Sequence, residues 1–169
     1  ETESTVSTLS PGGNYVVAAS NVIVRFYNNN SVMSCNGINN FTINSIDTFN
    51  NSNIAICGTN TVPTYDTGIV ASLYSNANLL LSPAWSREVS RAGYNVSLNG
   101  LIVDHSGNIV FEGTTVGSTE FIGKFDKSGN LLWAKENNNI DEAAGVIAID
   151  NVDNISVSYT HLTLPTILL

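Results

Sequence analysis

The chain repeats itself, and this repeat is the feature that most constrains its fold. Four asparagines each open a run of mostly apolar residues: NYVVAAS from Asn14, NIAICGT from Asn53, NIVFEGT from Asn108 and NISVSYT from Asn154. Successive asparagines are roughly 40 to 55 residues apart, a period typical of propellers and solenoids rather than of a single closed core. We therefore expect an array of similar units, in which the four asparagines have a structural role.

The third repeat divides into four segments of strand length: Ser97–Asp104, Asn108–Thr114, Glu120–Asp126 and Asn130–Lys135. Each segment is rich in Ile, Val, Leu, Phe or Trp and is bounded by Gly, Asn, Asp or Ser, as β-strands usually are. The connectors HSG and KSG are short and contain glycine, which favours tight hairpin turns. No window has an apolar stripe with the period of a helix.

These features predict an all-β fold, a partial β-propeller of four-stranded antiparallel blades. About three and a half such blades fit the chain. Their predicted bounds are residues 1–40 for the first blade, 41–93 for the second, 94–140 for the third and 141–156 for the start of the fourth.

One known family has a similar pattern. In the third repeat, DHSGNIVFEGT is followed by FIGKFDKSGNLLWAK and then by DEAAGV. This pattern resembles the bacterial β-propeller repeat often called SBBP, over the chain as far as Thr160 and most closely in the third repeat. The resemblance implies a propeller fold and an extracellular or cell-envelope location, and it implies no catalytic residue. A WD40-like or quinoprotein-like propeller is the alternative.

The two ends of the chain suggest a fragment of a longer protein. Propeller rings usually close with four to eight blades, so we expect the remaining blades to lie outside this chain. Beyond Thr160 the sequence abandons the repeat, and SYTHLTLPT resembles a translated sequencing adapter. We therefore leave residues 157–169 out of the predicted fold, as one would a fusion scar. A genuine terminal strand is the alternative.

The charge of the chain limits its partners. The formal net charge is −8, with only six Lys and Arg residues. Nucleic-acid binding needs clustered cations, and so does binding to an anionic membrane surface. No apolar run is long enough to span a bilayer. We expect a protein or a glycan as partner, no cofactor, and no nucleic acid or membrane insertion.

Two sets of recurring residues invite a structural interpretation. Asp47, Asp104 and Asp150 each follow the first strand of a unit, where a carboxylate accepts hydrogen bonds from the turn. A ring of carboxylates holding a cation is the alternative, but recurrence in each unit favours the turn. Trp85 and Trp133 end corresponding strands, and we expect them to pack between neighbouring sheets rather than to stack on a sugar.

Function is expected on the longer connections, because binding residues concentrate in such loops. No nucleophile motif, zinc motif or phosphate loop is present, so we predict neither a catalytic residue nor a metal site. The leading hypothesis is a non-enzymatic extracellular module. One alternative is a fragment of a hydrolase or lyase with catalytic carboxylates on its loops, such as Asp66 and Glu142. The other is a purely structural array. The candidate ligand-binding residues are Tyr65, Asp66, Arg87, Arg91, Glu136, Asp141 and Glu142.

Overall fold

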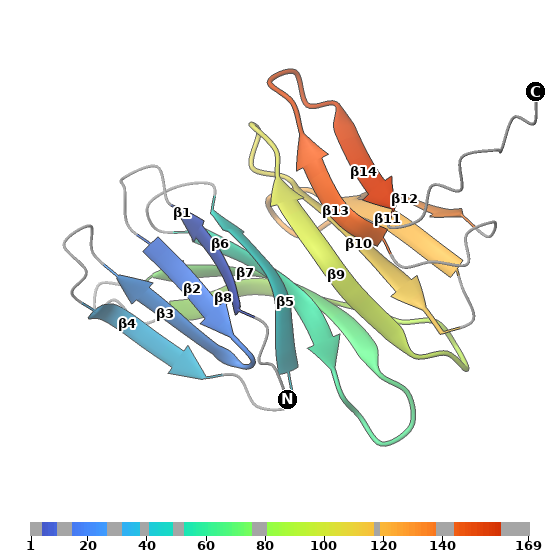
Figure 1. Ribbon diagram of the computed structural model, residues 1–169, viewed down its shortest axis with the longest axis horizontal. Helices are drawn as coiled ribbons and strands as arrows, with labels where there is room; N and C mark the ends of the chain where they lie inside the picture. The colour runs from blue at the N-terminus through green and yellow to red at the C-terminus, as the bar shows by residue number, and fades with distance from the viewer. Residues whose placement is uncertain are drawn as a thin grey trace, which may run out of the picture.

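The computed structural model describes residues 5–9, 15–26, 32–37, 41–48, 53–75, 81–116, 119–137 and 144–159. Within these residues the chain forms fourteen β-strands (Figure 1). The same residues contain no helix long and apolar enough to cross a membrane. The prediction of an all-β fold with four-stranded antiparallel sheets is confirmed.

The strands form four sheets, and within each sheet every strand pairs with the next one along the chain. The first sheet contains β1 (Thr5–Leu9), β2 (Tyr15–Ala19), β3 (Val22–Phe26) and β4 (Val32–Gly37). The second contains β5 (Phe41–Thr48), β6 (Asn53–Asn60), β7 (Thr67–Ser75) and β8 (Leu81–Val89). The third contains β9 (Val96–Val103), β10 (Ile109–Thr115), β11 (Thr119–Phe125) and β12 (Leu131–Asn137). The fourth has β13 (Ala144–Ile149) and β14 (Ile155–Tyr159) in the described part of the chain.

The third sheet follows its sequence pattern closely. The four segments expected from the third repeat coincide with β9 to β12 to within two residues at each end. In its hairpin turns Gly107 and Gly129 both adopt a φ of 82°, a left-handed conformation that glycine tolerates well. The fourth sheet differs from the expected boundary, because β14 continues past Ser156 and Val157 pairs with Ile147. Residues 160–169 lie outside the described residues.

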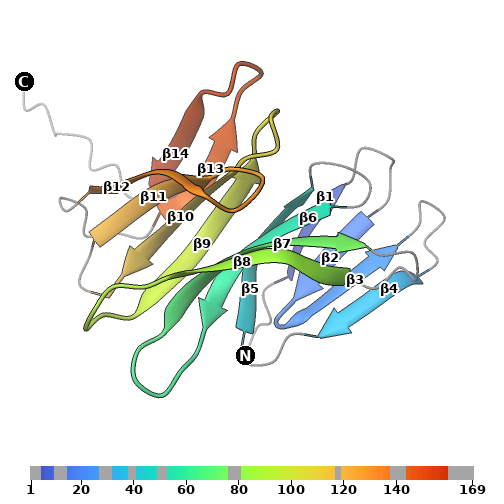
Figure 2. The same ribbon diagram turned by 180° about the vertical axis from the view of Figure 1, so that it is seen from behind.

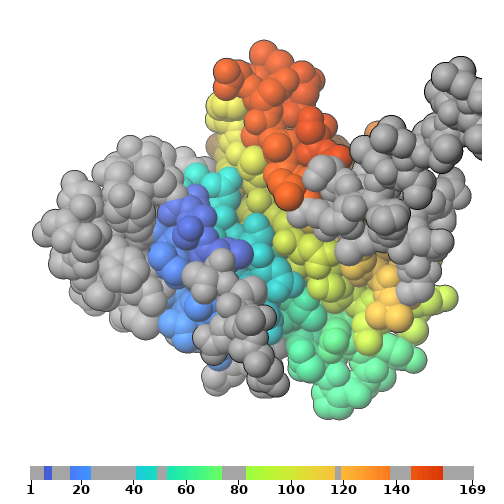
Figure 3. All heavy atoms as spheres, in the orientation of Figure 1, coloured from blue at the N-terminus to red at the C-terminus, as the bar shows by residue number. Residues whose placement is uncertain are grey.

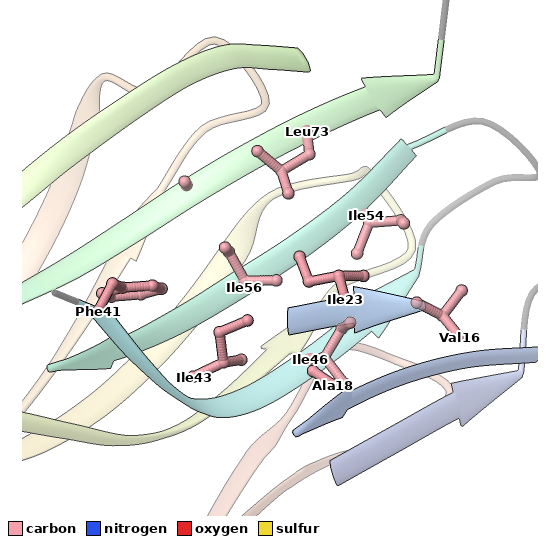
Figure 4. Close-up of a cluster of buried hydrophobic side chains, with 10 residues drawn as sticks. Val16, Ala18, Ile23, Phe41, Ile43, Ile46, Ile54, Ile56 and Leu73 are labelled. Carbon is pink, nitrogen blue, oxygen red and sulfur yellow. The ribbon is translucent and has the colours of Figure 1, made fainter. Parts of the chain in front are cut away.

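Neighbouring sheets pack face to face, and their first strands lie in chain order. β1 contacts β5, β5 contacts β9, and β9 contacts β13. Figure 3 shows the blue first sheet, the cyan β5 and the yellow-green β9 side by side on one face of the molecule. Between the first and second sheets, Ile23 from one side packs with Ile43 and Ile56 from the other in a dry cluster (Figure 4). Burial of such side chains stabilises the stack.

Side chains also link the first strands of the second and third sheets. The Nδ2 atom of Asn44 donates to the carbonyl oxygen of Leu98 at 2.7 Å. The backbone N–H of Leu101 donates to Oγ of Ser45 at 3.1 Å. The N–H of Val103 donates to Oδ2 of Asp47 at 2.9 Å. These bonds satisfy polar groups of β9 that no neighbouring strand reaches on that side.

Asp47 occupies a different register position from Asp104, with which the sequence aligned it. Asp47 pairs with Ala55, the register position that Ile102 occupies in the third sheet, so it lies two residues earlier than Asp104. The physical reason is the length of the connection. Asp47 precedes its asparagine, Asn53, by two residues more than Asp104 precedes Asn108. The carboxylate of Asp47 therefore lies within β5 and accepts the N–H of Val103 in the next sheet, while residues 49–52 of its own turn lie outside the described residues.

Candidate functional site

Three hairpin turns share one hydrogen-bonding pattern, centred on Asp104, Asp126 and Asp150. In each turn, Oδ1 accepts the N–H groups of the residues two and four positions later, at 2.8–2.9 Å. Oδ2 accepts Nδ2 of the asparagine four positions later, at 2.7–2.8 Å. Hydrogen bonds from these asparagines lower the pKa of Asp126 and Asp150. The pattern fixes the turn and leaves these carboxylates engaged within the protein.

Asp104 has a further partner. The Nζ atom of Lys124 lies 2.7 Å from Oδ2 of Asp104, and both side chains are largely buried. Burial raises the pKa of Asp104, but hydrogen bonds from Lys124 and Asn108 outweigh this effect and hold the pKa below its ordinary value. The ion pair fastens the turn between β9 and β10 to β11. Asp104 therefore has a structural environment.

His105 and Asp153 connect the third and fourth sheets. The Nδ1 atom of His105 lies 2.6 Å from Oδ1 of Asp153, and the backbone N–H of His105 donates to the same oxygen at 3.2 Å. Asp153 has a φ of 64° and occupies the turn position that glycine occupies in the two turns of the third sheet. An aspartate at a left-handed glycine position is the sequence feature that could have indicated this contact.

Three of the predicted ligand-binding residues line one groove. Arg87, Arg91 and Glu136 border a groove of about 370 Å³ between β8 and the pair β11–β12. Figure 2 shows β8 and β12 on the side of the molecule that faces the viewer. The apolar lining includes Phe121, Phe125 and Leu131. The groove thus combines an aromatic and aliphatic lining with charged residues contributed by distant parts of the chain.

Two cations of the groove have different roles. Nη1 of Arg91 lies 3.8 Å from Oε2 of Glu136, and the Arg91 guanidinium lies 5.2 Å from the centroid of the exposed Tyr94 ring. Arg87 is fixed more firmly, because its Nε donates to the carbonyl oxygen of Gly129 at 2.7 Å. Arg87 and Glu136 lie within strands, whereas the sequence placed them in loops. Arg91 lies in the connection after β8, as expected.

The remaining predicted ligand-binding residues do not join this groove. Tyr65 is exposed in the connection between β6 and β7. The N–H of Asp66 donates to Oδ1 of Asn95 at 2.9 Å, and its carbonyl oxygen accepts the N–H of Val96 at 2.9 Å. Asp66 thereby fastens its loop to the start of β9, through a partner, Asn95, that the sequence did not single out. Asp141 and Glu142 lie outside the described residues, and so does Asn14.

The two tryptophans differ although their positions are equivalent. Nε1 of Trp85 donates to the carbonyl oxygen of Lys127 at 2.9 Å, and the Trp85 ring meets Phe125 edge-on with centroids 5.8 Å apart. Trp85 therefore packs on the third sheet. Trp133 is only half-buried, in a strand whose other residues are exposed. Trp85 packs on the turn between the third and fourth strands of the next sheet, and the residues that follow β14 in the fourth sheet lie outside the described residues, so the burial of Trp133 between sheets stays a prediction.

A second pocket, of about 220 Å³, contains two acidic residues that the sequence did not single out. Glu112 on β10 is 1% exposed and Glu120 on β11 is 4% exposed. Burial raises the pKa of Glu112 to about 7, and the charge of Glu120 acts in the same direction. One sequence feature could have revealed the site. In NIVFEGT the glutamate occupies the position of Cys57 and Ala18 in the preceding repeats.

Metal ligands do not gather in the described part of the chain. No group of three or more His, Cys, Asp or Glu side chains there is arranged to hold a metal ion.

The comparisons with known proteins bear on the fold. No family model matches the chain, and no curated protein is similar to it. The structure is similar to the crystal structure of a protein of unknown function from Bacteroides caccae, with a TM-score of 0.61 and 8% sequence identity. The match covers 93% of this chain and 53% of that protein, so the chain spans about half of its length. The likeness shows a shared fold.

Proposed function

We propose that the four sheets are successive blades of a β-propeller, and that this propeller binds a protein or a glycan outside the cytoplasm without catalysing a reaction. Two observations support the propeller. The first strands of successive sheets contact one another in chain order, and each sheet packs its face against the next. Blades arranged around an axis have this geometry. The resemblance to SBBP repeats supports the extracellular or cell-envelope location.

The binding proposal rests on the groove between β8 and β11–β12. Charged residues from two strands and one connection meet there above an apolar lining. Arg91 and Glu136 are both substantially exposed, so their separation by a ligand costs little. Arginine and tyrosine side chains are enriched at the energetic centres of protein interfaces. Arg91 stacked on Tyr94 provides such a pair at the groove.

The lining favours a polypeptide as the first ligand to test. Phe121, Phe125 and Leu131 provide apolar surface that would cover the aliphatic or aromatic side chain of a partner. A glycan is the second ligand to test, since a sugar ring could stack on the exposed Tyr94 ring. In either case Arg91 and Glu136 would supply the charged contacts.

The proposal is tested by comparing variants on peptide and glycan arrays, followed by titration of the best ligand. Arg91→Gln and Glu136→Gln remove the two charges and leave a polar side chain at each position. Each should weaken binding about fivefold or more, the effect of losing one interface contact. Lys127→Gln is the matched control, because Lys127 is an exposed charge in the turn between β11 and β12 and does not line the groove.

The outcomes separate the competing functions. Equal weakening by Lys127→Gln would indicate non-specific charge effects and would contradict the groove. A complete absence of binding to both arrays would favour the purely structural array. Hydrolysis of a polysaccharide on the array would favour the hydrolase or lyase. Circular dichroism of each variant shows that the sheets are intact before binding is compared.

A further inference from the structure

The pocket that contains Glu112 and Glu120 lies on the opposite face of the third sheet from the groove. Glu112 follows Phe111 directly in β10, so the two side chains point to opposite faces of the strand. Phe111 packs in the cluster shared with the second sheet, whereas Glu112 approaches β13 of the fourth sheet. The two linings share Phe121 and Glu136, but neither Glu112 nor Glu120 borders the groove, so variants of these two glutamates test the pocket separately from the groove.

The strand register places both glutamates on this one face. Glu112 pairs with Ile122, and Glu120 pairs with Thr114, two residues further along β10. The glutamates are therefore diagonal neighbours, with backbone positions roughly 7–8 Å apart and side chains within reach of one group. The charge of Glu120 acts on Glu112, as expected for two carboxyl groups at close range.

The fold makes room for the carboxyl group of Glu112. A Cβ atom on Gly100 would lie 2.7 Å from Oε1 of Glu112 and 3.2 Å from Cγ2 of Ile147. Only glycine at position 100 leaves the carboxyl group in this place. Neither oxygen of Glu112 has a hydrogen-bond partner in the described part of the chain. A buried carboxylate without such a partner destabilises a protein unless another group neutralises it.

The repeat itself does not require charge at these positions. Glu112 occupies the position of Cys57 and Ala18, which are both fully buried in apolar clusters. Glu120 occupies the position of Gly68. The third sheet thus has two carboxyl groups where the other sheets pack with small residues, so the glutamates serve something other than packing.

The chemistry of the walls selects the kind of cation. Two glutamates give fewer ligands than Ca²⁺ usually takes in proteins, and no third acidic or histidine side chain joins them in metal-binding geometry within the described residues. Ile122 and Val157 line the same pocket and provide apolar surface. An aliphatic stem would contact such walls, while its charged end would reach the carboxylates.

We propose that this pocket binds a primary ammonium or guanidinium group on an aliphatic stem, with the carboxylates of Glu112 and Glu120 as its counter-charges. The cation would come from a free alkylamine or from a lysine or arginine side chain of a partner polypeptide. Lys135 lines the pocket entrance and competes with the incoming cation. The pocket therefore selects for a stem long enough to pass Lys135 and reach the two glutamates.

Titration calorimetry tests the proposal with two probes, 1,5-diaminopentane and a short peptide with a central lysine. Binding should rise with pH through about 7, as Glu112 loses its proton beside Glu120; Lys135 and Glu136 are the other ionisable groups that line the pocket. Cys57 adds no charge to the site, because burial raises the pKa of its thiol. Glu112→Gln and Glu120→Gln should each weaken binding at least about tenfold.

Matched variants give the controls. Glu88→Gln removes an exposed glutamate that borders the groove and not this pocket, and it should leave binding of 1,5-diaminopentane unchanged. Lys135→Gln removes the competing cation and should strengthen binding. Tighter binding of the amine than of the peptide identifies a small-molecule site, and the reverse order identifies a side-chain site; both support the proposal. No heat at about 10 mM of either probe, or equal binding by Glu112→Gln and the unmodified chain, overturns it.

Discussion

The interface between the second and third sheets and the interface between the third and fourth sheets are formed by equivalent strands but differ in chemistry. At the first of these interfaces Cys57 and Leu98 belong to one apolar cluster. At the second, the equivalent register positions contain Glu112 and Ala144. From the first interface to the second, alanine thus replaces leucine at one register position, and glutamate replaces cysteine at the other.

The outer strands repeat this contrast. Trp85 and Arg87 of β8 donate hydrogen bonds to the turn between β11 and β12. Their equivalents in β12 are Trp133 and Lys135, and Lys135 lines the pocket. One backbone repeat can therefore support both a dry structural interface and a polar pocket. The difference depends on a few substitutions at equivalent positions.

The largest expected effect concerns the dry interface. Leu98 is fully buried and covers the backbone of Gly68, where an added Cβ would come within 2.6 Å of it. Leu98→Ala gives this interface the residue found at position 144 and should lower the free energy of unfolding by about 3 kcal/mol. Urea denaturation measures the change. Leu132→Ala, at an exposed residue of β12, should cost less than about 0.5 kcal/mol. Similar losses of unfolding free energy for Leu98→Ala and Leu132→Ala would show that the interface around Leu98 contributes no more to stability than the exposed strand β12.

The next effect concerns the polar pocket and depends on pH. The pKa of Glu112 is about 7 in the folded chain and near its ordinary value of 4.5 after unfolding. The folded state thus binds the proton more tightly, so this stabilisation is complete below about pH 4.5 and is lost as the pH rises through about 7. We expect Glu112→Gln to be more stable than the unmodified chain by about 2 kcal/mol at pH 8 and equally stable at pH 4.5.

Denaturation at a series of pH values measures this difference, with Glu88→Gln as the exposed control. A parallel pH dependence for Glu112→Gln and the unmodified chain would show that another group is responsible. The loss of stability at low pH has a different origin. Because hydrogen bonds from Lys124 and Asn108 hold the pKa of Asp104 low, its contribution is lost as the pH falls below the ordinary aspartate range.

The two tryptophans provide the third test. Trp85→Ala removes a hydrogen bond to Lys127 and an edge contact with Phe125, and it should cost about 1.5 kcal/mol at a half-buried site. Trp133→Ala should cost less than about 1 kcal/mol, because the fourth sheet, in its described residues, packs on β9 and β10 rather than on β12. Thermal unfolding of the two variants measures the ratio. A larger loss for Trp133→Ala would place that indole in a core.

The repeating architecture could be predicted from the sequence because strands and turns are local features. The alternation of apolar runs with D-x-x-G-N turns was enough to locate β9 to β12 to within two residues. It was not enough to assign Asp47, because the role of that carboxylate depends on the register of β5 against another sheet. Local pattern gives the strand but not its neighbour across an interface.

The candidate sites were predictable only in part, for the same reason. Arg91 and Glu136 were singled out, yet their meeting at one groove depends on how β8 and the connection after it lie against the third sheet. Glu112 and Glu120 were missed because each glutamate alone resembles an ordinary polar strand residue. Only the pairing of β10 with β11 places them together, and the neighbourhood of Glu112 includes Ile147 of β13 in the next sheet.

The smallest expected effect concerns the turn between β13 and β14, in which Asp153 has the left-handed conformation that glycine has in the turns of the third sheet. Asp153→Gly gives the turn between β13 and β14 the residue found at Gly107 and Gly129, and it removes the contact with His105. Glycine relieves the cost of a left-handed backbone, whereas loss of an exposed side-chain contact costs little, so the two effects nearly cancel. We expect the melting temperature to change by less than roughly 2 °C. A loss larger than that of Trp85→Ala would mean that this polar contact, rather than apolar packing, holds the fourth sheet against the third. The His105 ring resonances, followed by NMR in both chains, would show directly whether the contact is formed in solution.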